Sequence, residues 1–141
     1  LDGSAFVDGL NGGVMHSTEA STVAGVNDAT VFGGWVNYST GPVSLGYRLS
    51  ENSAGAGTEK NVEAYAIAFN VNDEMSLSVA TQDIEFDVPS GTNTTETINA
   101  LNASYTMGAA SVRATMSEAS DDAGVAGADD EHMEISLVLS F

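Results

Sequence analysis

The chain of 141 residues ends in the stretch EHMEISLVLSF, residues 131–141, in which apolar residues occupy every second position. A period of two is typical of a β-strand with one apolar and one polar face. A soluble domain seldom ends on an aromatic residue of its apolar face. The fold class therefore depends on whether this face packs against other parts of the protein or against lipid. The residues between the apolar ones are mostly polar, and the apolar set consists of Met133, Ile135, Leu137, Leu139 and Phe141.

The same alternation occurs in six further stretches, and it predicts seven antiparallel strands in all. Most of these strands are ten to fourteen residues long, whereas strands of globular proteins most often have about 5–6 residues. Long strands at this density indicate the wall of a barrel. The six further stretches cover residues 29–40, 43–52, 60–71, 74–87, 94–107 and 110–120.

The connections between the predicted strands alternate in length. Short turns occur at Gly41, at Asn72 and around Gly108, which are turn-forming residues. Longer polar loops follow the second, fourth and sixth predicted strands. Short turns at one end and long loops at the other are typical of transmembrane barrels. We therefore assign residues 29–141 to a transmembrane antiparallel β-barrel, and residues 1–28 to an outer loop or a constriction loop.

The aromatic residues favour a membrane barrel over a soluble β-sandwich. A sandwich would show the same alternation, with its apolar face turned inward. In a membrane barrel, aromatic side chains gather where the wall crosses the membrane–water interface. The aromatic residues that share the apolar faces, often near a strand end, are Tyr38, Tyr47, Tyr65, Tyr105 and Phe141.

The predicted strand at residues 74–87 changes phase along its length. Its apolar residues have odd numbers up to Val79, whereas Ile84 and Phe86 have even numbers. A bulge near Gln82 would explain this shift, and so would a strand that continues beyond the membrane. We favour the second explanation, because acidic residues alternate with Ile84 and Phe86 and a lipid-facing surface would not tolerate them.

The composition excludes several classes of function. Asp and Glu number 20 against 3 Lys and Arg, which gives a formal net charge of -17. Nucleic acid is therefore not expected as a partner, because binding phosphates requires basic residues. The absence of cysteine excludes disulfides, thiolate metal sites and thiol nucleophiles. His16 and His132 match no metal-binding motif, and the G-x-S-x-G motif is absent, so we expect no enzymatic activity and no catalytic cofactor.

These features resemble the porins of Gram-negative bacteria, especially those of the α-proteobacterial type. The resemblance rests on the closing strand with Phe141, on the hairpin NASYTMGAASVRATMSEAS, and on Ser-, Gly- and Asp-rich loops. It implies a homotrimeric protein of the bacterial outer membrane that contacts the lipid bilayer and lipopolysaccharide. It also implies that the outer-membrane assembly machinery recognises the closing strand, and that each subunit is a water-filled channel for passive diffusion of small hydrophilic solutes and ions.

A 16-stranded porin needs about twice this length. Seven strands are also an odd number, whereas bacterial single-chain barrels have even numbers. We therefore expect the C-terminal part of a larger porin. The alternative is a small eight-stranded barrel whose first strand lies in SAFVDGL, residues 4–10.

Residues on the polar faces of the predicted strands would line the channel. All three Lys and Arg residues have this parity. The simpler interpretation is that charge is excluded from lipid. The alternative is a basic wall opposite acids on an inward-folded loop, which porins use to orient polar solutes. The expected pore-lining residues are Arg48, Lys60, Gln82, Asn102, Arg113 and Glu134.

The acidic residues concentrate in and beside the long loops, where a solvated outer surface is the simplest interpretation. Negative charge near the mouth predicts a mild cation preference. Clustered carboxylates also suit calcium, and the candidate ligands are Asp121, Asp122, Asp129 and Asp130. The competing class is a secreted acidic β-sandwich, of the adhesin or surface-layer type, that binds calcium through its loops.

Overall fold

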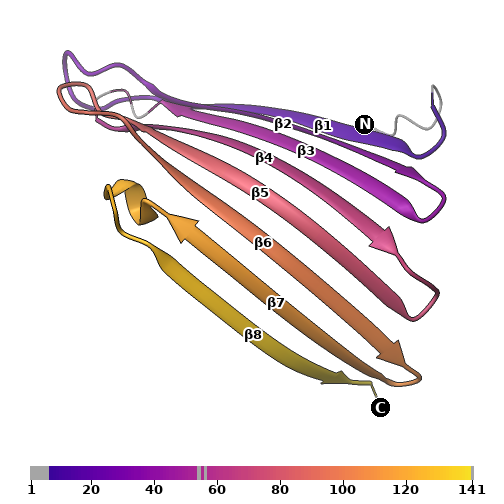
Figure 1. Ribbon diagram of the computed structural model, residues 1–141. Helices are drawn as coiled ribbons and strands as arrows, with labels where there is room; N and C mark the ends of the chain where they lie inside the picture. Colours follow the sequence, from indigo (N-terminus) through magenta and orange to yellow (C-terminus); the bar gives the residue numbers. More distant parts are fainter. Residues whose placement is uncertain (1–6, 54, 56, 141) are drawn as a thin grey trace.

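The computed structural model describes residues 7–53, 55 and 57–140, most of which lie in one antiparallel sheet (Figure 1). Its eight strands are paired in chain order, each with the next, and a short 3-10 helix, η2 (Asp122–Gly124), precedes the last strand. The strands are β1 (Leu10–Glu19), β2 (Ala29–Thr40), β3 (Val43–Ser53), β4 (Glu59–Asn70), β5 (Met75–Asp87), β6 (Thr94–Met107), β7 (Ala110–Ser120) and β8 (Asp130–Leu139).

The seven strands predicted from alternation are confirmed as β2 to β8. Their bounds differ from the prediction by two residues at most. Phe141, which the prediction placed at the end of the closing strand, lies outside the described residues. Alternation was a reliable guide because a strand with one apolar face must repeat every second residue.

Strand β1 corrects the assignment of residues 1–28 to an outer or constriction loop. It begins at Leu10 and pairs with β2 along its whole length. Gly12 and Gly13 lie within it, so neither face carries a continuous row of large apolar side chains. The alternation was therefore too weak to reveal a strand. The alternative that placed a first strand at residues 4–10 located it too early in the chain, and residues 1–6 are not described.

The tight turns all lie at one end of the sheet and the longer connections at the other (Figure 1). Gly41 and Gly108 have φ angles of 53° and 60°, a left-handed conformation that glycine adopts without a steric penalty. In the turn between β4 and β5, the Asn72 side-chain oxygen accepts hydrogen bonds from the backbone N–H groups of Glu74 and Met75, at 2.9 and 2.7 Å. Each turn therefore has the chemistry of a hairpin.

The pairing of β5 with its neighbours has no interruption at Gln82. Its register with β4 is constant from Glu59↔Asp87 to Asn70↔Ser76, and its register with β6 is constant as well. A bulge would have placed two residues of one strand opposite one residue of the other. The phase change in the sequence therefore reflects a change of surroundings along a regular strand.

The sheet is a single layer, and its large hydrophobic side chains are exposed. Among the described residues, no hydrophobic residue is buried. Met133, Ile135 and Leu137 are each 63–65% exposed. A β-sandwich would bury one face of each sheet against a second sheet, so the sandwich alternative is wrong. Within the described part of the chain, no helix is long and apolar enough to cross a membrane.

Candidate functional site

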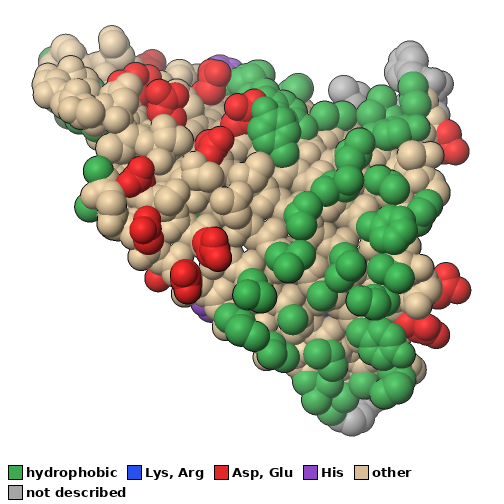
Figure 2. Space-filling model, in the orientation of Figure 1, with side chains coloured by type: hydrophobic (Ala, Val, Ile, Leu, Met, Phe, Trp, Pro, Cys, Tyr) green, Lys and Arg blue, Asp and Glu red, His purple; other side chains and the backbone are tan. Residues whose placement is uncertain are grey.

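One face of the sheet carries a continuous apolar band. Residues that pair directly in neighbouring antiparallel strands point to the same side of a sheet. Figure 2 shows the resulting hydrophobic surface, which extends over much of this face. We call it the outer face. One row of directly paired residues within the band consists of Leu45, Ile67, Val79, Leu101, Met116 and Met133.

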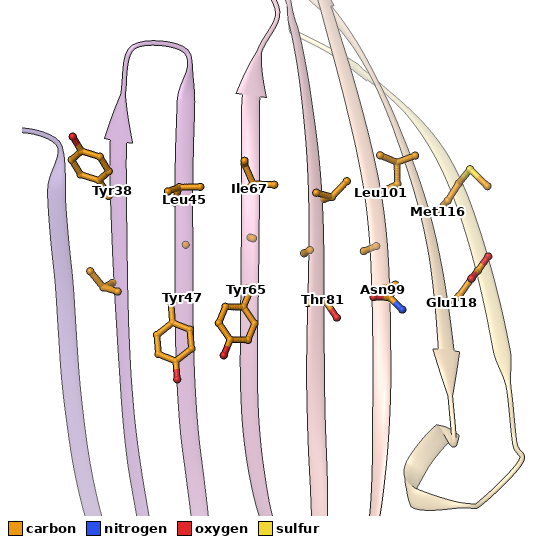
Figure 3. A pocket seen from close by; sticks show the side chains of 16 residues that line it. Tyr38, Leu45, Tyr47, Tyr65, Ile67, Thr81, Asn99, Leu101, Met116 and Glu118 are labelled. Carbon is orange, nitrogen blue, oxygen red and sulfur yellow. The ribbon is translucent and has the colours of Figure 1, made fainter.

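Two tyrosines lie at the edge of this band and share one acceptor. The rings of Tyr47 and Tyr65 are 5.0 Å apart, and both hydroxyls donate to the Glu63 Oε1 atom, at 2.7 and 2.6 Å. Figure 3 shows the two rings beside a groove of about 850 Å³ on this face, with Leu45 and Ile67 nearby. Aromatic rings with a hydrogen-bonded hydroxyl suit the level at which a membrane meets water.

Beyond the band, the outer face becomes acidic. On β5 the outward residues change from Val79 to Thr81 and then to Asp83. Figure 2 shows acidic side chains beyond the edge of the hydrophobic surface, and no Lys or Arg side chain is visible on this face. The acidic residues that the register places on the outer face beyond the band are Glu51, Glu59, Glu63, Asp83, Glu85, Asp87, Glu118 and Glu131.

The opposite face, which we call the inner face, carries all six residues expected to line a channel. Arg48 pairs with Ala64, which pairs with Gln82, and Asn102 pairs with Thr115. The register therefore places the six residues, one from each of the strands β3 to β8, on one side of the sheet. They are Arg48, Lys60, Gln82, Asn102, Arg113 and Glu134.

The contacts of these inner residues are few. The Thr115 hydroxyl donates to the Asn102 side-chain oxygen at 2.8 Å, and the Lys60 ammonium lies 4.8 Å from the centre of the Phe86 ring. Within the described part of the chain, no carboxylate lies within 4.0 Å of a Lys or Arg nitrogen, and His132 and Glu134 are 3.8 Å apart. Arg48, Lys60 and Arg113 therefore form no ion pair with an acid in the described residues, and the transverse field stays a prediction.

Trp35 also lies on the inner face, although it was not among the residues predicted to line a channel. It pairs with Arg48, and its indole lies over Gly13 of β1, where an added Cβ atom would be 2.7 Å from Nε1. The parity of the strand could have identified it, because Val36 and Tyr38 alternate with it on the outer face. A half-exposed aromatic side chain thus lies beside a basic one on the inner wall.

The candidate calcium ligands are not brought together. Asp121, Asp122 and Asp129 lie in the loop between β7 and β8, and Asp130 is the first residue of β8. The Asp121 carboxylate accepts a hydrogen bond from the backbone N–H of Gly127 at 2.6 Å. Within the described residues, no group of three or more His, Cys, Asp or Glu side chains could hold a metal ion. Carboxylates that are close in the sequence are thus not gathered into a metal site, and the Asp121 carboxylate instead binds the backbone of its own loop.

An exposed apolar band on one face and a polar surface on the other are what a membrane-spanning wall requires. A family model for Gram-negative porins matches residues 3–138. The chain belongs to the Gram-negative porin family. Family membership places this porin in the bacterial outer membrane and supports the expectation that it carries no enzymatic activity. The α-proteobacterial type stays a prediction.

One solved structure shares the fold of this porin. It is the anion-selective porin from Comamonas acidovorans, with a TM-score of 0.78 and 19% sequence identity. The match covers 92% of the present chain and 40% of the other, so the chain spans less than half the length of that porin. A comparison with curated proteins found no match.

Proposed function

We propose that the chain forms part of the wall of a 16-stranded porin barrel, through which small hydrophilic solutes and ions diffuse passively. The observation that supports this most strongly is the single-layer sheet, apolar on its outer face and polar on its inner face. Strands β1 and β8 are the two edges of the sheet, where further strands would close a barrel. Eight strands matched to 40% of a solved porin are in keeping with half of such a barrel.

The orientation follows from the two ends of the sheet. In bacterial barrels the short turns lie on the periplasmic side and the long loops outside the cell. The acidic part of the outer face would then lie above the membrane, at the level of the lipopolysaccharide headgroups. We also propose that β8 is the strand that the assembly machinery recognises, and that the protein forms homotrimers.

The mild cation preference expected from the composition has little support from the arrangement of charges. Most acidic residues of the strands beyond the apolar band lie on the outer face and point away from the lumen, whereas Arg48, Lys60 and Arg113 all lie on the inner face. The similar solved porin is described as anion-selective. We therefore propose that ion preference depends on the charges of the inner face, and that Arg48 and Arg113 attract anions.

The test is the reversal potential of the channel in planar bilayers under a gradient of KCl. The double substitution Arg48→Ala and Arg113→Ala should shift the reversal potential, on the order of 10 mV, in the direction of a higher permeability for cations. Glu118→Gln removes a charge from the outer face and is the matched control, with no shift expected. An unchanged reversal potential in the double variant would refute the role of the two arginines. Absence of conductance steps from the unsubstituted protein would refute the channel itself.

A further inference from the structure

The inner face changes character beyond the membrane band. Val62 pairs with Ile84, and Lys60 pairs with Phe86, so apolar side chains lie on the lumen side in the part of the sheet whose outer face is acidic. Ile98 pairs with Gln82 and adds to this group. Apolar side chains that face a water-filled lumen require a cover, because exposure of apolar surface to water is unfavourable.

The loop between β7 and β8, residues 121–129, leans over part of this surface. Its 3-10 helix η2 contacts β6 and β5. The hydroxyl of Thr94 donates to the Gly124 carbonyl oxygen at 2.9 Å. A Cβ atom added to Gly124 would lie 2.9 Å from the ring of Phe86, so the backbone of the loop packs directly on that ring.

Glu96, a residue of β6, anchors the loop to the sheet. Its side chain is only 8% exposed, and among the described residues no other charged side chain is buried. Its Oε2 atom accepts a hydrogen bond from the backbone N–H of Ala123 at 3.2 Å. A buried acceptor that binds the backbone of a distant segment fixes the position of that segment.

The loop is also closed by its own bonds. The backbone N–H of Asp122 donates to the Ala128 carbonyl oxygen at 2.7 Å, across the base of the loop. Asp121 and Ala123 have φ angles of 54° and 53°, which residues other than glycine seldom adopt. Such conformations persist where the surrounding contacts determine the backbone, so the loop is a compact unit with one defined position.

We propose that residues 121–129 form a fixed inner lip of the channel mouth that limits the size of the solutes that enter, with Glu96 as its positioning residue. The proposal rests on the proposed channel function. The loop connects β7 to β8 but lies on the lumen side of β5 and β6, and it therefore occupies part of the cross-section of the mouth.

The experiment compares solute entry in liposomes that contain the complete protein as extracted from outer membranes. The swelling rate in raffinose, divided by the rate in arabinose, reports the size limit. Glu96→Ala removes the acceptor and should raise this ratio about threefold or more. Glu96→Gln keeps an acceptor oxygen and should leave the ratio unchanged, which a merely electrostatic role of Glu96 would not predict.

A second pair of variants tests the lip without altering Glu96. Gly124 and Gly127 both have a φ angle of 76°, so alanine strains the backbone equally at either position. At Gly124 the added Cβ meets Phe86 and Thr94 at 2.9 Å, whereas at Gly127 it meets nothing within 4 Å. Gly124→Ala should therefore raise the ratio and Gly127→Ala should not.

Unchanged ratios in both Glu96→Ala and Gly124→Ala would overturn the proposal, as would an equal rise in Glu96→Ala and Glu96→Gln. If the unsubstituted protein admits no arabinose, the channel function fails instead, so the two failures are distinguishable.

Discussion

The two halves of strand β5 differ in polarity although the strand is regular throughout. In the half near the tight turns, Leu77 and Val79 face outward and Ser78 faces inward. In the other half, Asp83 faces outward and Ile84 faces inward. The first half has the arrangement of a membrane wall, and the second has the arrangement of a sheet in a soluble protein.

The difference shows that the surroundings of a strand, and not its backbone, decide which face is apolar. Lipid selects apolar side chains on the outside of the barrel, and a water-filled lumen accepts small or polar ones. Beyond the membrane, water lies outside and the loop of residues 121–129 covers part of the inside. The level at which the two faces exchange character marks the boundary of the membrane on each strand.

The largest expected effect comes from placing a charge on the outer face of β5, in the half that faces lipid. Val79→Arg places a charge within the apolar band, so it should destabilise the folded barrel in lipid by about 2–4 kcal/mol. Asp83→Arg, four residues further along the same face, should cost about 0–1 kcal/mol because it lies beyond the band. Urea unfolding in lipid vesicles measures both. Equal losses at the two positions would contradict a membrane boundary between them.

A smaller effect is expected on the inner face of the second half. Phe86→Ala removes a half-buried ring that contacts Gly124 and lies beside the Lys60 ammonium, so it should cost about 1–2 kcal/mol. The same unfolding measurement applies. Thr95→Ala is the control, because Thr95 is exposed on the outer face at the same level and should have little effect. A loss from Phe86→Ala no larger than that from the control would mean that this inner surface is not covered.

Much of the fold could be predicted because a period of two in the sequence translates directly into two faces. Strand bounds, tight turns and the parity of Arg48 and Arg113 all followed from it. Strand β1 could not be predicted, because Gly12 and Gly13 give its faces no contrast. The ion preference could not be derived from the composition for a different reason, since net charge carries no information about the face on which each charge lies.

The loop and its anchor could not be predicted either. Glu96 and Ala123 are far apart in the sequence, and nothing in either segment signals that one accepts a hydrogen bond from the other. The acidic residues of the loop suggested calcium, whereas Asp121 uses its carboxylate to bond the backbone of Gly127. Contacts of this kind depend on how a loop folds, and periodicity does not describe loops.

The central claim is that the outer face of each strand meets lipid in one half and water in the other. Single cysteines along β5, from Met75 to Asp87, test it directly, because the chain contains no native cysteine. Each would carry a nitroxide label in lipid vesicles, and accessibility to oxygen, which dissolves in lipid, would be compared with accessibility to a water-soluble nickel chelate. We predict that positions 75, 77 and 79 are accessible to oxygen and that positions 83, 85 and 87 are accessible to the chelate. Accessibility to oxygen that continues through position 87, or that occurs at the even-numbered positions, would contradict the account.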